Sequence, residues 1–80
     1  MSQNSIDNQI KALTEAIEAG GAAADVYFRR GMLNWKAGRR AAAITDYETA
    51  VSLDADSPAA EALRMSRDIM DFRHNDLLNP

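Results

Sequence analysis

Few side chains in this sequence could carry acid-base, nucleophilic or metal chemistry. His74 is the only histidine and there is no cysteine, so the sequence holds neither a thiol nucleophile nor a His/Cys ligand set for a metal. Carboxylate pairs such as Glu15 with Glu18, and Asp54 with Asp56, fall where we expect solvated helix surface or loop. We therefore predict no catalytic residue, no metal site and no cofactor, in a protein that is not an enzyme.

Noncovalent binding is the chemistry that one apolar stripe could support. Phe28, Met32 and Trp35 recur at spacings of four and three residues, which places them on one side of a helix. Arg29 and Lys36 lie beside this stripe and could select the charge of a partner. A small domain tends to bury such a stripe, because it has little other apolar surface from which to build a core. Both interpretations stay open, and burial is the one favoured.

Basic residues gather in the same part of the chain. No acid occurs between Asp25 and Asp46, an interval that contains five basic residues: Arg29, Arg30, Lys36, Arg39 and Arg40. We interpret this segment first as a solvated corner whose arginines pair with acids elsewhere, and second as a patch for an acidic ligand. Nucleic-acid binding is not expected, because the patch is small and the net charge is −3.

Composition indicates one small helical domain. The chain has 80 residues, of which 46% are hydrophobic, largely alanine, and 26% are charged. No apolar run approaches the roughly 20 residues of a membrane span, and the polar start of the sequence does not resemble a secretory signal. The lack of cysteine fits a reducing compartment. We expect a cytoplasmic protein with no membrane contact.

Helical spacing of apolar residues recurs in four segments. The predicted helices are 6–19, 23–37, 39–53 and 58–75. Asn4 or Ser5 is the candidate N-cap of the first helix, Gly38 is expected to close the second, and Ser57-Pro58 is a strong start signal for the fourth. In the third helix, Asp46 is expected away from the apolar side. The fold class is therefore all-α.

The chain also repeats itself with a period of 34 residues. This shift superimposes Ile10 on Ile44, Leu13 on Tyr47, Ala16 on Ala50 and Ile17 on Val51. A period of 34 residues is typical of the tetratricopeptide repeat. In this phase 6–19 is a half repeat, 24–57 is one complete repeat, 58–75 is a C-terminal capping helix and 76–80 is a tail.

The complete repeat resembles the tetratricopeptide repeat (TPR) family. The composition and the tail of the chain are similar to those of short stand-alone bacterial members. Tyr27 stands for the Trp of the motif, Gly31 for its Gly, Ala43 and Ala50 for its small residues, and Tyr47 for its Phe. We expect these five to form the packing contact between the two helices of the repeat.

Three positions depart from the motif. Arg30 replaces its Leu, Asn34 replaces its Tyr and Ala55 replaces its Pro. The inner packing of the first helix of the repeat is therefore expected to be partly polar.

The resemblance implies an antiparallel array of four helices that binds a peptide or protein through its concave face. The implied partner-binding residues are Phe28, Arg29, Met32, Trp35 and Lys36. The alternatives are recognition of an acidic ligand by the basic segment 29–40, and a self-associating structural module. In the latter, a second copy packs on an apolar face of the last helix, giving a homodimer; this face consists of Leu63, Ile69, Met70 and Phe72.

Overall fold

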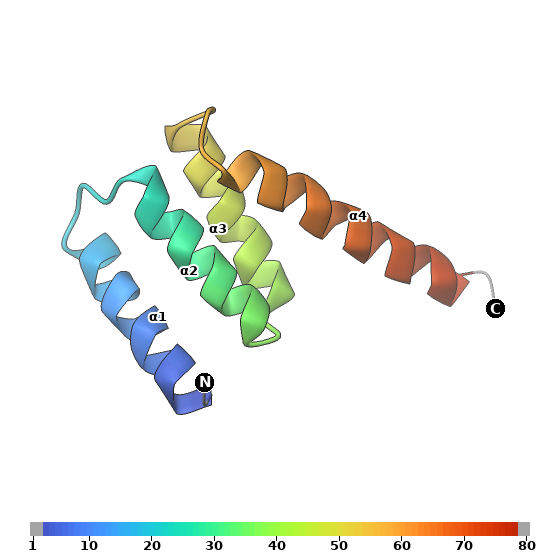
Figure 1. Cartoon of the computed structure of the whole chain (residues 1–80), viewed down its shortest axis with the longest axis horizontal. Helices are drawn as coiled ribbons and strands as arrows, with labels where there is room; N and C mark the ends of the chain where they lie inside the picture. Colours follow the sequence, from blue (N-terminus) through green and yellow to red (C-terminus); the bar gives the residue numbers. More distant parts are fainter. Residues whose placement is uncertain (1–2, 79–80) are drawn as a thin grey trace.

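The computed structural model describes the backbone of residues 3–78 and the side chains of residues 5–69, and all of its regular structure is helical. The four helices are α1 (Gln3–Glu18), α2 (Ala24–Lys36), α3 (Arg40–Leu53) and α4 (Ala59–Leu78). Helices that follow one another in the sequence pack against each other, and the C-terminal half of α4 extends away from the other three helices (Figure 1). The predicted all-α helical array is confirmed.

Gly38 ends α2 in the way that the sequence predicts. Its φ of 84° lies in the left-handed region, which suits a residue without a Cβ. The N–H of Gly38 donates to the carbonyl of Trp35, and the N–H of Arg39 donates to the carbonyl of Asn34 at 2.8 Å. This pair of hydrogen bonds is a Schellman motif, and it turns the chain directly into α3.

Ser57 starts α4 as predicted. Its Oγ accepts a hydrogen bond from the N–H of Ala59 at 3.1 Å, and its carbonyl accepts one from Ala60 at 3.0 Å. Pro58 follows, at a position that needs no N–H donor. The helix runs to Leu78, so 76–78, expected in a tail, are helical.

The N-cap prediction for α1 is wrong. This helix already includes Gln3, so both Asn4 and Ser5 lie inside it. The Ser5 hydroxyl accepts a hydrogen bond from the Gln9 side chain one turn later, at 3.4 Å, so it serves the helix as a surface residue. The side chain that the sequence analysis placed at the start of the helix thus lies within its first turn.

The core lies where α2 crosses α3. Ala43, Tyr47 and Ala50 of α3 are buried together with Ala59 of α4, and Tyr27 of α2 packs against them. Gly31 is also buried, and a Cβ built there would lie 2.6 Å from Cε1 of Tyr47. The two helices can approach this closely only because residue 31 has no side chain.

Replacing Gly31 by alanine should therefore destabilise the protein. A helical Gly→Ala change ordinarily adds about 1 kcal/mol of stability, but the methyl group would clash with the Tyr47 ring and with the Ala43 carbonyl, 3.3 Å away. We expect a net loss of about 1 to 2 kcal/mol in the free energy of unfolding. Urea denaturation followed by circular dichroism measures this loss. In a Tyr47→Leu background the same change should cost less, and a Gly31→Ala protein more stable than the wild type would refute the packing argument.

Candidate functional site

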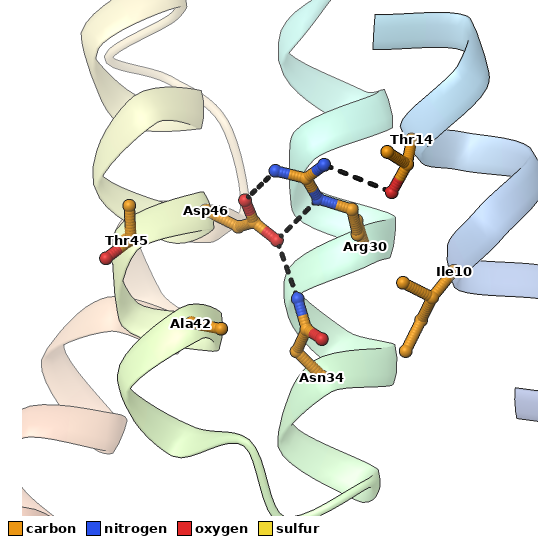
Figure 2. A pocket seen from close by; sticks show the side chains of 7 residues that line it. All are labelled: Ile10, Thr14, Arg30, Asn34, Ala42, Thr45 and Asp46. Atoms are coloured by element: carbon orange, nitrogen blue, oxygen red, sulfur yellow. Dashed lines mark hydrogen bonds and ion pairs between the residues drawn. The ribbon is translucent and has the colours of Figure 1, made fainter. Parts of the chain in front are cut away.

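A buried polar cluster joins the three N-terminal helices. Asp46 of α3 is only 2% exposed and accepts hydrogen bonds from Nε and Nη2 of Arg30 at 2.9 and 2.6 Å. It also accepts one from the Asn34 side-chain amide at 2.9 Å. Nη1 of Arg30 donates to the Thr14 hydroxyl of α1 at 3.3 Å, as Figure 2 shows. These contacts raise the pKa of Arg30, first through the hydrogen bond to Asp46, so the guanidinium stays charged.

The expectation that Asp46 lies on the polar side of its helix is wrong. The partly polar packing predicted for Arg30 and Asn34 is present, but the sequence reasoning missed the acid that completes it. Two buried donors on α2 need an acceptor on the facing helix, and this need was the signal that could have identified Asp46.

A cavity of about 280 Å³ lies beside this cluster, between α1, α2 and α3. Its remaining walls come from Ile10 and Thr14 of α1 and from Ala42 and Thr45 of α3 (Figure 2). The space corresponds to the position where the TPR motif has the larger Tyr in place of Asn34. The polar cluster thus fills the helix interface less completely than an aromatic side chain would.

Placing the Leu and Tyr of the TPR motif at positions 30 and 34 should make the Arg30–Asp46 ion pair dispensable for stability. Asp46→Ala alone would leave Arg30 and Asn34 without their acceptor and should cost about 3 kcal/mol. The triple variant Arg30→Leu, Asn34→Tyr, Asp46→Ala should have a free energy of unfolding at least as large as that of the wild type. The reason is that an apolar cluster replaces the ion pair as a whole. Urea denaturation checks both values. The exposed Arg39–Asp7 pair provides the control, since Asp7→Ala should cost under about 1 kcal/mol.

The predicted stripe of Phe28, Met32 and Trp35 divides between different surroundings. Phe28 packs inward, with its ring centroid 6.1 Å from that of Tyr47. Trp35 is half-buried, and the Arg40 guanidinium lies 5.0 Å from the centre of its ring. Met32 is 40% exposed and faces a different hollow.

An apolar hollow of about 200 Å³ lies between α2 and α4, with Tyr47 of α3 also lining it. Its other lining residues are Trp35, Ala62, Met65, Ser66 and Ile69. Met65 is 53% exposed and Ile69 is 42% exposed, so two large apolar side chains one turn apart on α4 face the same hollow. Met65 is missing from the binding residues that the sequence predicts, although it occupies the position of the motif Gly, where a neighbouring helix normally packs closely.

A second hollow of about 300 Å³ lies between α1 and α2. Arg29, Met32 and Lys36 line it, together with Gln9, Leu13 and Leu33. The structure thus brings together three of the five residues predicted to bind a partner, and separates them from Phe28 and Trp35.

The five basic residues do not form one patch. Arg30 belongs to the buried cluster, Arg39 pairs with Asp7 of α1 at 3.1 Å, and Arg40 covers Trp35. Only Arg29 and Lys36 share a hollow. The first interpretation, in which the arginines pair with acids elsewhere in the chain, therefore describes Arg30 and Arg39, and Arg29 pairs with the exposed Asp25 at 3.7 Å.

Within the described part of the chain, no group of His, Cys, Asp and Glu side chains is arranged to hold a metal ion. The side chain of His74 lies outside the described residues. Among the described helices, none is long and apolar enough to cross a membrane.

Burial of Tyr47 makes the free energy of unfolding depend on pH. Desolvation of its phenolate, with a smaller contribution from the charge of Asp46, raises the pKa of Tyr47 above 10. As the pH rises, the unfolded chain therefore loses this proton before the folded chain does. The contribution of Tyr47 to stability is fully present below about pH 10 and is lost as the pH rises through the folded-state pKa.

We therefore expect the free energy of unfolding to fall above about pH 10. Tyr47→Phe should make this fall shallower, because residue 47 then has no proton to lose. Urea denaturation at a series of alkaline pH values gives the two slopes. Equal slopes in the wild type and the variant would show that Tyr47 does not contribute.

Comparison with known proteins identifies one segment of the chain. Residues 24–57, which form α2, α3 and the start of the connection to α4, match the tetratricopeptide repeat family. This segment of the chain is a tetratricopeptide repeat, a class of helical repeat that generally mediates protein-protein interaction and is generally non-catalytic. No curated protein and no solved structure matches the chain significantly.

Proposed function

We propose that this protein is a non-catalytic interaction module that binds a peptide segment of a partner protein in the hollow between α2 and α4. The observation that carries the proposal is the apolar lining of this hollow, in which Met65 and Ile69 are exposed beside Trp35. Exposed apolar surface of this kind is typical of protein-binding sites.

The chemistry of the hollow suits an apolar anchor from the partner. Ser66, Tyr47 and Trp35 are the lining residues that carry polar groups, and none of its described lining residues is charged. Met65 can adapt its unbranched side chain to the shape of the anchor. Trp35 supplies a large, rigid surface, with the guanidinium of Arg40 over its ring. An aliphatic or aromatic side chain of the partner would displace water from these groups.

This proposal revises the predicted binding residues. Trp35 is kept, Met65 and Ile69 are added, and Phe28 becomes a supporting residue beneath Tyr47. The cytoplasmic location and the absence of nucleic-acid binding stay predictions from the sequence.

Peptide selection tests the proposal. A displayed library of random peptides is selected on the full chain, and binding of the selected peptides is followed through the emission of Trp35, the only tryptophan. We expect the emission to change on binding and the double variant Met65→Ser, Ile69→Ser to lower affinity about tenfold. Leu53→Ser is the matched control, since Leu53 is 56% exposed and does not line the hollow. Failure to select any peptide, or an equal loss with Leu53→Ser, would count against this site.

A second copy of the chain is the alternative occupant, favoured by the same exposure of Met65 and Ile69. The face predicted for this purpose is changed by the structure, because Leu63 packs against the core. The side chains of Met70 and Phe72 lie outside the described residues. Sedimentation of the wild type beside the Met65→Ser, Ile69→Ser variant decides between the two occupants: a concentration-dependent dimer that the variant abolishes supports self-association.

A further inference from the structure

The internal repeat shows that α1 has one neighbouring helix fewer than α3. A shift of 34 residues relates α1 to α3 and α2 to α4. The contact between α1 and α2 therefore corresponds to the contact between α3 and α4. The contact of α3 with the helix before it, α2, has no counterpart at α1 among the described residues (Figure 1).

The exposure of equivalent residues locates the uncovered surface on α1. Ala43 and Tyr47, which α2 covers on α3, are 0% and 4% exposed. Their equivalents on α1 are Gln9, which is exposed, and Leu13, which is only half-buried. This side of α1 thus corresponds in the repeat to the side of α3 that packs against α2, but it is not buried.

The same comparison holds for α2 and α4. Ser66 of α4 is 5% exposed, whereas its equivalent Met32 on α2 is 40% exposed. Leu63 of α4 packs against the core, whereas the side chain of its equivalent Arg29 is 68% exposed. Gln9, Leu13, Arg29 and Met32 all line the hollow of about 300 Å³ between α1 and α2. The place that a neighbouring helix would occupy is thus uncovered on both α1 and α2.

Charge indicates what kind of helix would fit. The described lining of this hollow includes two cations, Arg29 and Lys36, and no acid. Among the described residues, Arg29 pairs with the exposed Asp25, at 3.7 Å, and such a surface pair is weak enough to be exchanged for a closer acid. Between the cations lies the apolar surface of Leu13, Met32 and Leu33.

We propose that the hollow between α1 and α2 binds an amphipathic helix of a partner protein, with acidic residues flanking its apolar stripe. The helix would lie against α1 as α2 lies against α3, with apolar residues at i, i+3 or i+4, and i+7 contacting Leu13 and Met32. Its acids would pair with Arg29 and Lys36. This site is separate from the hollow between α2 and α4, so it adds a second binding surface to the one proposed above.

Two synthetic peptides test this surface against the full-length chain. Both are capped helices of about 18 residues with the same Leu/Ala stripe, and they carry either Glu or Lys at the flanking positions. Fluorescence anisotropy of the labelled peptide measures affinity. We expect the Glu peptide to bind about tenfold more tightly than the Lys peptide, and the difference to shrink as salt is added. Absence of binding, or equal binding of the two peptides, would overturn the proposal.

Variants then assign the binding to this hollow. Lys36→Glu should reduce the preference for the Glu peptide, whereas Lys11→Glu makes the same charge change two residues from both Gln9 and Leu13, on the opposite side of α1. Met32→Gln should weaken both peptides. Equal effects of Lys36→Glu and Lys11→Glu would reduce the result to general charge attraction and reject the site.

Two further measurements distinguish this proposal from the binding site between α2 and α4 and from self-association. The Met65→Ser, Ile69→Ser variant should bind the Glu peptide normally, so failure of the α2/α4 site leaves this one standing. Sedimentation of the chain alone tests the other occupant: a dimer that Lys36→Glu dissociates would assign the hollow to a second copy and overturn the proposal of an acidic partner helix.

Discussion

The ring of Tyr47 lies against the backbone of Gly31, and this contact sets how closely α2 and α3 approach each other. The small side chains of Ala43 and Ala50 allow the same close approach on either side of the ring. Everything else in the described structure is arranged around this crossing. It places Asp46 within reach of α2, and Tyr47 also lines the hollow beside α4.

The polar cluster at Asp46 is the least expected consequence of that crossing. A buried ion pair contributes less stability than an apolar interface of the same volume, because both charges lose their hydration. This cluster offsets part of that cost by directing three hydrogen bonds at one carboxylate and by extending to Thr14 of α1. The cluster therefore links α2 to both α1 and α3.

The two open hollows follow from the short length of the described array. A repeat protein buries the faces of each helix against its neighbours, so the helices at either end retain uncovered surface. At the C-terminal end, α4 presents the charges of Glu61, Arg64 and Asp68, which pair with one another and solvate that side. No equivalent set of ion pairs covers Leu13 and Met32 among the described residues, and the apolar surface at that end stays accessible.

The local elements of this protein are determined by the sequence alone. Gly38 and Ser57 end and begin helices through hydrogen bonds made within a few residues, and the 34-residue period follows from side-chain spacing that any reader of the sequence can measure. The family resemblance rests on the same local pattern, which is why the repeat at 24–57 could be recognised without a structure.

The tertiary structure decided which neighbour each helix face meets. Asp46 appeared to be a surface acid, because its own helix gives no sign that two donors approach from α2. Phe28, Met32 and Trp35 share one side of α2, yet they separate between the core and two hollows because different helices contact each of them. Spacing along a helix is a property of the local backbone, whereas burial depends on how distant helices cross, and only the folded chain contains that information.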